Sequence, residues 1–259
     1  MSTFKLTVAY DGTGMVGWQR QATGTSVQGV LEDALSDLDG RPVAATGAGR
    51  TDAGVHARAQ IVGVTLTRSI EGGAVVRALN VRLPLTIRVL DATEVADTFH
   101  ARFDARSKEY RYRIWNADVV DPFERLYVWH VLAPLDRAAM AQAALVLQGR
   151  HDFAAFQGIG TDVQSTEREV LFSRITGGTS GVDAGPLITY DVSGDGFLRH
   201  MVRNIVGTLV EIGRGKRPPG WMAEVLASRN RAEAGVTAPP EGLFLMRVTY
   251  GATALAAGR

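Results

Sequence analysis

Apolar and polar residues alternate at the start of the chain, and this pattern predicts a half-buried strand over residues 4–10. A helical spacing of apolar residues then predicts a helix that begins at Thr25 or Ser26 and ends near Leu38. The rest of the first half is expected to form a strand, a strand, a helix and a strand, over 41–48, 59–67, 73–80 and 85–95. The predicted order is βαββαβ, the ferredoxin-like order.

The second half repeats this order of elements without repeating the sequence. Strands are predicted over 109–116, 168–176, 187–193 and 243–250, helices over 135–147, 197–213 and 219–227, and one turn near 152–156. We therefore expect an α+β protein made of two ferredoxin-like βαββαβ halves, 1–104 and 105–259. Side by side, they would form a broad, mostly antiparallel sheet with helices on one face and the other face open to a ligand.

Composition excludes several classes of protein. The 259 residues include no cysteine, which excludes a disulfide scaffold, a thiolate metal site and a cysteine nucleophile. The five histidines are far apart and form no pair with metal-ligand spacing, so no metal site is expected. No apolar run approaches the ~20 residues of a membrane span, and residues 1–6 lack the layout of a signal peptide. We expect a soluble, cytoplasmic protein.

Positive charge gathers in two stretches although the formal net charge is only +1. Residues 99–115 contain five basic side chains against Asp104 and Glu109, and residues 196–217 contain five against Glu211. Such stretches can present a positive face to a polyanion such as a nucleic acid, but they are also typical of ordinary solvated surface.

A glycine pattern follows the first predicted strand. Residues 12–17 match G-x-G-x-x-G, which in dinucleotide-binding proteins opens a helix at the second glycine. Here the helix is predicted to begin only near Ser26, and no acidic residue ends the next predicted strand. A turn with close approach of the backbone to some ligand is the favoured interpretation. A dinucleotide-dependent oxidoreductase remains an alternative.

Residues 46–57 form a loop of small residues that also carries Arg50, Asp52 and His56. Its glycines and alanines leave room for a substrate to approach one guanidinium and one carboxylate closely. An aspartate among small residues is also a common turn former. From composition alone, both interpretations of Asp52 stay open.

Two later segments carry candidate contacts. On the predicted strand 109–116, alternation places Tyr110 and Tyr112 on one face, where they either fill the core or stack on nucleobases. On the predicted helix 197–213, helical spacing places four residues on one face: His200, Arg203, Asn204 and Gly207. Glycine within a helix indicates close packing, and a partly buried arginine requires an anionic partner, which is in many proteins a purely structural one.

Taken together, these segments resemble the tRNA pseudouridine synthase A family. The central match is 49–57 (GRTDAGVHA), which resembles the catalytic loop of the family. Further matches occur in the same order over roughly residues 4–250: YDGT at 10–13, GWQ at 17–19, SVQ at 26–28, LE at 31–32, FHARF at 99–103, KEYRY at 108–112, HDF at 151–153, GF at 196–197, MVRNIVG at 201–207 and APPEGL at 238–243. Met15 departs from the family, where an aromatic residue is expected.

The resemblance implies an isomerase that converts uridine to pseudouridine at positions 38, 39 and 40 of the anticodon stem-loop of tRNA. It implies a homodimer that grips tRNA, an RNA-binding cleft on the open face of the sheet, and neither metal nor organic cofactor. Asp52 would be the essential aspartate and Arg203 its partner. Arg50 would enter the space left by the flipped nucleotide, Tyr110 would stack on the target base, and Leu245 would lie against that base.

The chemistry suits these residue types. The target nucleotide must leave its stack, which costs a few kcal/mol, and an arginine can offset this cost by stacking and phosphate contacts. An ionised Asp52 could attack the ribose at C1′ as a nucleophile or act as a base at C2′, and the sequence leaves both open. C5 finally loses a proton, and Tyr110 or water could take part as a catalytic group in that step. A non-catalytic tRNA-binding module is a further alternative, against which the intact Arg50 and Asp52 loop argues.

Overall fold

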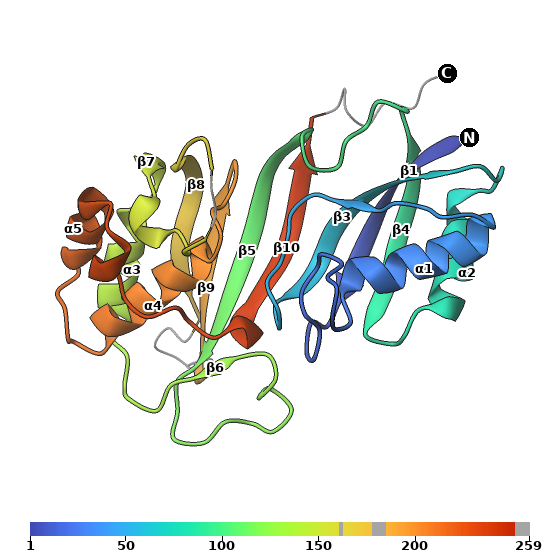
Figure 1. Cartoon of the computed structure of the whole chain (residues 1–259). Helices are drawn as coiled ribbons and strands as arrows, with labels where there is room; N and C mark the ends of the chain where they lie inside the picture. The colour runs from blue at the N-terminus through green and yellow to red at the C-terminus, as the bar shows by residue number, and fades with distance from the viewer. Residues whose placement is uncertain (161–162, 178–184, 252–259) are drawn as a thin grey trace. The chain divides into compact units, whose positions relative to one another are not determined.

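The computed structural model of the chain describes residues 1–160, 163–177 and 185–251. Its contacts divide the chain into two compact units. Unit 1 comprises Met1–Lys108 and the C-terminal segment that begins at Phe244, and unit 2 comprises Glu109–Leu243. In Figure 1, the N-terminal part of unit 1 runs from blue to green and its last strand is red. The return of this last strand to unit 1 is a feature that the order of elements alone did not predict.

Unit 1 begins with the predicted order βαββαβ. Its elements are β1 (Ser2–Tyr10), α1 (Val27–Asp39), β2 (Thr46–Gly47), β3 (His56–Leu66), α2 (Gly72–Arg82) and β4 (Ile87–Val95). The last strand, β10 (Leu243–Tyr250), joins them in the strand order β4-β1-β3-β10, with β2 beside β3. β1 is antiparallel to both β3 and β4, whereas β10 is parallel to β3.

The core of unit 1 follows from the apolar pattern. Every second residue of β1 is buried from Phe4 to Tyr10, and α1 buries the stripe of apolar residues that predicts it. Ser26 caps α1 by accepting a hydrogen bond from the Gly29 N–H, and Gly40 ends it in the left-handed region. In Figure 1, α1 lies in front of the strands, and α2 packs on β4.

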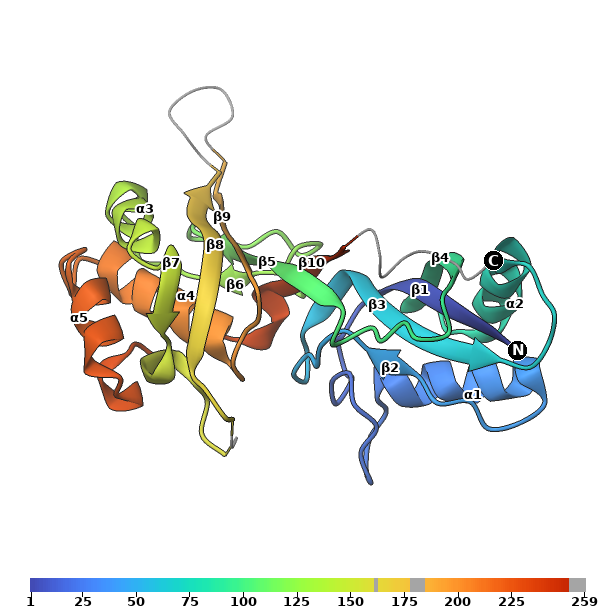
Figure 2. The ribbon, with the colours of Figure 1, turned by 90° about the horizontal axis from the view of Figure 1, so that it is seen from above.

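Unit 2 contains the remaining strands and helices. They are β5 (Ala105–Trp115, which begins in unit 1), β6 (Trp129–His130), α3 (Arg137–Leu145), β7 (Gly149–Asp152), β8 (Glu167–Thr176), β9 (Leu187–Gly194), α4 (Met201–Gly213) and α5 (Trp221–Ser228), with short 3₁₀ turns at Ala154–Phe156, Arg231–Glu233 and Pro240–Gly242. The strand order is β5-β9-β8-β7, with β6 parallel to β5. The three helices contact one another, and α3 packs on β8 (Figure 2).

The described residues thus form ten strands and five α-helices with mostly antiparallel pairing, and the predicted α+β class is confirmed. Within this part of the chain, no helix combines the length and the apolar character that a membrane span requires.

One predicted strand is largely wrong. Residues 41–48 were expected to form a strand, but only Thr46–Gly47 pair with β3. The reason is that side chains of α1 occupy the backbone donors of this segment: the Val43 N–H donates to Ser36, and the Ala45 N–H donates to the Glu32 carboxylate. Pro42 has no N–H to donate at all.

The predicted helix 197–213 begins four residues late, at Met201. His200 adopts the left-handed backbone conformation, with φ of 60°, and therefore cannot continue a right-handed helix. The prediction that His200 shares a helical face with Arg203 is wrong for this reason. The short strands β6 and β7 were not predicted, because two and four residues are too short to show a period.

Candidate active site

The loop that carries Arg50 and Asp52 is held by the glycine-rich segment 12–18, although neither forms regular structure. The Trp18 N–H donates to the Thr51 carbonyl at 3.0 Å, and the Gly54 N–H donates to the Met15 carbonyl at 3.3 Å. The Val55 N–H donates to the Asp52 carbonyl at 3.1 Å and closes a turn. Asp52 is therefore the first residue of a hydrogen-bonded turn. Thr51 before it and Gly54 after it are both hydrogen-bonded to the 12–18 segment.

Two glycines make this approach possible. Gly17 has φ of 107°, and a Cβ there would lie 2.7 Å from the Thr51 carbonyl oxygen. A Cβ on Gly12 would overlap the Val55 carbonyl. The glycines of the G-x-G-x-x-G pattern thus leave room for the Asp52 loop of the chain itself. The sequence had favoured close approach of a ligand instead. The helix that a dinucleotide site needs does not begin here, since α1 begins at Val27.

A buried pair of hydroxyl groups fixes the residue between Arg50 and Asp52. The Tyr10 hydroxyl lies 2.8 Å from the Thr51 Oγ1. Burial raises the pKa of Tyr10 to about 12, although the hydrogen bond with Thr51 acts in the opposite direction. Tyr10 is therefore a neutral hydroxyl at physiological pH, and Thr51 is held through both its side chain and its carbonyl.

His56, the first residue of β3, links this loop to two other segments. Its Nδ1 lies 3.0 Å from the Gly12 N–H donor and 3.1 Å from a carboxylate oxygen of Asp11. The first contact requires an unprotonated Nδ1 and the second a protonated one, so they belong to different states of the ring. The buried ring also stacks on Phe244 of β10, with 4.6 Å between ring centres.

The loop presents its two charged residues differently. Arg50 is exposed and Asp52 is half-buried, whereas Thr51 between them is buried. On the other side of Arg50, the Gln60 side-chain amide donates to the Gly49 carbonyl at 2.8 Å. The backbone is thus fixed on both sides of Arg50 and Asp52. This arrangement suits a guanidinium and a carboxylate that must meet a substrate in a defined position.

Leu245 belongs to the same unit. It is fully buried on β10, in parallel register with Ala57 of β3. The strand β3, beside Leu245, begins directly after the Asp52 turn. Unit 1 therefore contains three of the five residues proposed from the sequence: Arg50, Asp52 and Leu245.

Tyr110 and Arg203 belong to unit 2. On β5, Tyr110, Tyr112 and Ile114 are buried and alternate with less buried residues, as the alternation predicts. The Tyr110 ring meets Phe197 edge-on, with 5.1 Å between centres. Phe197 thus supports the ring from the segment that precedes α4.

Arg203 lies half-buried on α4, where its Nε donates to the Ala238 carbonyl at 2.7 Å. The Ala238 N–H donates back to the Arg203 carbonyl at 3.1 Å. A segment around Val236 passes so close to α4 that a Cβ on Gly207 would overlap the Val236 carbonyl. The close packing predicted from Gly207 is therefore confirmed.

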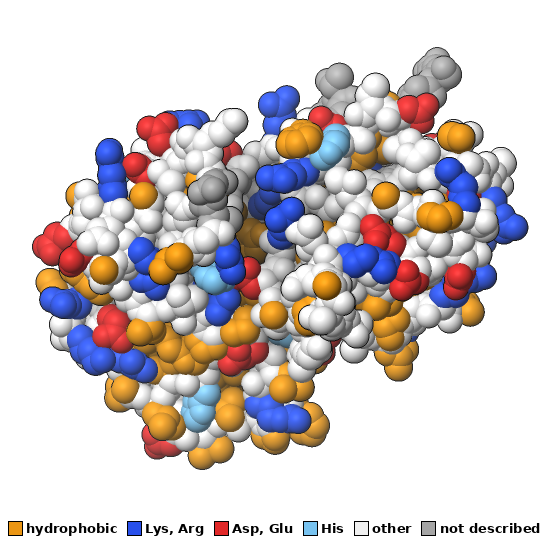
Figure 3. All heavy atoms as spheres, in the orientation of Figure 1, with side chains coloured by type: hydrophobic (Ala, Val, Ile, Leu, Met, Phe, Trp, Pro, Cys, Tyr) orange, Lys and Arg blue, Asp and Glu red, His pale blue; other side chains and the backbone are white. Residues whose placement is uncertain are grey.

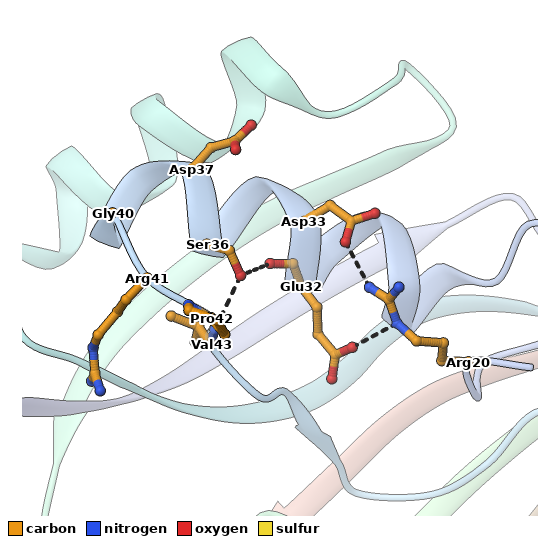
Figure 4. Close-up of a pocket in the computed structure, with 9 residues that line it drawn as sticks. All are labelled: Arg20, Glu32, Asp33, Ser36, Asp37, Gly40, Arg41, Pro42 and Val43. Carbon is orange, nitrogen blue, oxygen red and sulfur yellow. Dashed lines mark hydrogen bonds and ion pairs between the residues drawn. The ribbon is translucent and has the colours of Figure 1, made fainter.

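A surface depression of about 690 Å³ lies elsewhere on unit 1, beside α1. Figure 4 shows Arg20 reaching toward Glu32 and Asp33, to which it donates at 3.0 and 2.7 Å. The Gln28 side chain accepts a hydrogen bond from the Arg20 N–H and donates one to the Ala45 carbonyl. The Glu32 carboxylate accepts from the Ala45 N–H. No described residue of the predicted site lines this depression. Its hydrogen bonds connect the backbone at Arg20 and Ala45 to α1.

Known proteins resemble this chain over almost its whole length. A family model described as tRNA pseudouridine synthase matches residues 6–104 and 143–251. Proteins named tRNA pseudouridine synthase A are similar as well. The one from Myxococcus xanthus is 49% identical over 96% of this chain and 92% of its own length. Those from Syntrophotalea carbinolica and Moorella thermoacetica are 47% and 48% identical, each over 96% of this chain and over 97% and 100% of their own lengths.

The chain belongs to the tRNA pseudouridine synthase family. It is an isomerase that acts in tRNA modification, as the sequence resemblance implied. The two stretches matched by the family model contain Arg50, Asp52, Arg203 and Leu245, whereas Tyr110 lies between them.

Sequence reasoning on this tRNA pseudouridine synthase missed the residues that hold the Asp52 loop. Tyr10, Trp18 and His56 lie within the segments that carry the resemblance, but no role was assigned to them. The available signal was the co-occurrence of the 10–19 segment and the 49–57 segment, which indicates that the two act together. It does not show that one segment positions the other, because the contact depends on backbone atoms that no side-chain pattern reveals.

Proposed function

We propose that this enzyme isomerises uridines 38, 39 and 40 of the tRNA anticodon stem-loop, with Asp52 as the residue that acts on the ribose. The observation that carries the proposal is the fixed loop of unit 1. Thr51 is held by Tyr10 and Trp18, so the carboxylate beside it is oriented before the substrate arrives. Preorganisation of this kind is what a carboxylate needs to react at one carbon of a bulky RNA.

The reaction balances without a second substrate. The N1–C1′ bond of the uridine breaks, the uracil turns, and a C5–C1′ bond forms. C5 then loses its proton, and N1 gains one. Asp52 takes part either by bonding to C1′ or by removing a proton from C2′, and both routes regenerate the carboxylate at the end.

The other site residues have distinct roles in this proposal. The exposed Arg50 fills the space that the flipped nucleotide leaves in the RNA, where its guanidinium stacks and meets phosphates. Tyr110 stacks on the target uracil, and Leu245 lies against it. Arg203 pairs with Asp52 and orients its carboxylate.

The assembly belongs to the proposal too. The enzyme acts as a cytoplasmic homodimer that grips the anticodon stem-loop of tRNA in a cleft, and it uses neither metal nor organic cofactor. The wide basic stretch 99–115, which reaches from unit 1 into unit 2, favours a polyanionic substrate.

The position of modification is tested by mapping the product. Transcribed tRNAs with uridine at only one of positions 38, 39 and 40, and cytidine at the other two, are incubated with enzyme. Carbodiimide-blocked primer extension should then stop at that one uridine in each case. A tRNA with cytidine at all three positions serves as control. Stops outside these positions, or in the control, would overturn the assignment of the anticodon stem-loop.

A further inference from the structure

Phe103 presents its ring to solvent, with 75% of its surface exposed. Figure 3 shows many exposed apolar side chains on the face drawn, so exposure alone carries no argument. The side chains around Phe103 distinguish it from the other exposed apolar residues. Its ring stacks on His100, with 4.2 Å between centres and 28° between planes, and the Arg102 guanidinium lies 5.7 Å from the ring centre. An aromatic face beside a cation is the arrangement on which unpaired nucleobases stack.

Five hydrogen bonds hold the turn that carries this ring. The Asp104 carboxylate accepts a hydrogen bond from the His100 N–H at 2.8 Å, and the Asp104 N–H donates back to the His100 carbonyl at 3.1 Å. The His100 Nδ1 accepts from the backbone N–H groups of Arg102 and Phe103, each at 3.2 Å. The Tyr250 hydroxyl donates to the Ala101 carbonyl at 2.6 Å and fastens the turn to β10. The ring pair is therefore ordered before any partner binds, which lowers the entropic cost of binding.

Charge around the turn favours a phosphate-bearing partner. Arg102, Arg106 and Lys108 lie within five residues of Phe103, and the one carboxylate in that stretch, Asp104, already accepts a backbone hydrogen bond. Lys and Arg side chains beside an aromatic ring supply phosphate contacts while the ring supplies stacking. This combination fits RNA better than it fits an apolar protein surface.

The turn approaches β3 at a different point from the one at which the Asp52 turn enters this strand. Phe99 and Ala101 pack against Gly63 of β3, whereas the Asp52 turn enters β3 at His56. Ala57 and Gly63 are separated by six strand residues, or about 20 Å at ~3.3 Å per residue. The Asp52 turn and the Phe103 turn therefore meet β3 at separate positions, which suits contacts with two different nucleotides.

We propose that Phe103, stacked on His100 and flanked by Arg102, is a platform for a second, unpaired base of the tRNA substrate, on a turn that packs against β3 six residues beyond Ala57. This inference rests on the proposed function only in that tRNA is the substrate. The platform contributes to affinity for the RNA and takes no part in the reaction at the ribose.

The test measures tRNA affinity by filter binding at one fixed salt concentration, with unmodified transcript. Phe103→Ala and Phe103→Leu should raise the Kd about 5- to 100-fold, the range for loss of one base–aromatic stack. Phe103→Trp keeps an aromatic face and should bind like the wild type. Leu85→Ala, at an apolar residue of unit 1 that is 88% exposed, is the matched control and should leave the Kd unchanged. At saturating tRNA, kcat of Phe103→Ala should stay within about twofold of wild type, since stacking here is proposed to add only affinity.

Three results would overturn the platform. Wild-type affinity in Phe103→Ala would exclude a contact, and wild-type affinity in Phe103→Leu would reduce stacking to a general apolar contact. A lower oligomer mass in sedimentation, with unchanged affinity, would assign the ring to contact between copies of the chain. Release of tritium from uridine C5 separates the two proposals. If the wild type releases tritium while the Phe103 variants bind normally, the platform alone fails. If the wild type releases none while these variants lose affinity, the proposed function fails and the platform stands.

Discussion

The Asp52 loop of unit 1 and helix α4 of unit 2 each carry a charged residue of the proposed site, but different contacts shape the two backbones. Arg203 lies on a regular helix, whose backbone hydrogen bonds run between residues four apart, and Ala238 adds contacts with the carbonyl and the Nε of Arg203. Asp52 lies on an irregular loop that is fixed by bonds to residues around position 15, more than thirty positions earlier in the chain. The backbone at Asp52 therefore depends chiefly on long-range contacts, whereas the backbone at Arg203 is shaped by its helix, and the guanidinium is then held by the distant Ala238 carbonyl.

Substitution of a contact glycine should separate the two regions most strongly. In Gly17→Ala, the Cβ meets the Thr51 carbonyl and the backbone is strained, which should displace the Asp52 loop. We expect kcat to fall at least ~100-fold, with a loss of about 2–4 kcal/mol in the free energy of unfolding. Gly207→Ala should lose as much stability, because its Cβ overlaps the Val236 carbonyl. Its kcat per folded molecule should fall less, since the backbone of Arg203 stays helical even when the segment that holds its guanidinium, residues 236–238, shifts. Steady-state kinetics and urea denaturation measure both.

Gly14→Ala is the control for this experiment. Gly14 has φ of 74°, but a Cβ there would have no neighbour within 4 Å. It should therefore lose only about 1 kcal/mol from backbone strain and keep kcat within a few-fold of wild type. Equal losses of kcat in Gly14→Ala and Gly17→Ala would contradict the claim that contact with Thr51 positions the loop.

The two units should also differ in how much stability a hydrogen-bonded carboxylate loses in acid. Although burial raises the pKa of the Asp39 carboxyl, the Arg68 and Thr67 N–H groups and Arg41 lower it to about 2 from its ordinary 3.8. A lowered pKa stabilises the fold above the unfolded value, so this stability is present above pH 4 and is lost as the pH falls toward 2. The amount is about 2 kcal/mol. Asp39→Asn should remove it, and urea denaturation between pH 7 and pH 3 should show a flatter acid dependence than in wild type.

The comparison in unit 2 is Asp152, whose pKa is lowered chiefly by the hydrogen bond from Thr166. Its stabilisation has the same sign and is also lost in acid. It should be smaller than that of Asp39, because Asp152 is less buried and accepts fewer hydrogen bonds. An acid dependence unchanged in Asp39→Asn, or flattened more in Asp152→Asn, would contradict this ranking.

Two tyrosine hydroxyls give the smallest and finest test. Tyr10→Phe removes the hydroxyl that holds Thr51 and should lower kcat about 3- to 10-fold, with KM within about twofold, because one hydrogen bond contributes about 1 kcal/mol. Tyr112→Phe removes a hydroxyl that donates to the Pro239 carbonyl and should lower stability by a similar amount with less effect on kcat. Thr51→Ser should keep the wild-type kcat and Thr51→Val should not. A wild-type kcat in both Tyr10→Phe and Thr51→Val would show that the hydroxyl pair has no positioning role.

Regular elements could be predicted from the sequence, and irregular contacts could not. The alternation around Tyr110 and the helical stripe of α4 follow directly from periods of two and 3.6 residues. The sequence also marked Gly207 as a close contact. In contrast, the start of α4 was missed because the backbone angle of His200 leaves no trace in residue type. The strand predicted over 41–48 does not form because its backbone N–H groups donate to the side chains of Ser36 and Glu32.

The same division applies to the site. Asp52 and Arg50 were found through a resemblance, since composition alone left Asp52 as an ordinary turn former. The sequence interpretation assigned Gly12 and Gly17 to close approach of a ligand. A glycine pattern indicates only that some group lies close to the backbone, and it does not identify that group. Which partner comes close is decided by the tertiary fold, and here it is the Asp52 loop itself.

The central claim is that the carboxylate on this fixed loop performs the chemistry. The most direct measurement is tritium release from tRNA labelled at uridine C5, by wild type, Asp52→Asn, Asp52→Ala and the exposed control Asp91→Asn. We predict release by wild type and Asp91→Asn and none above background by either Asp52 variant, while all four bind tRNA with Kd values within about threefold, since Asp52 contributes to the reaction and little to affinity. Substantial release by folded Asp52→Asn, or tight binding without release by the wild type, would contradict the account.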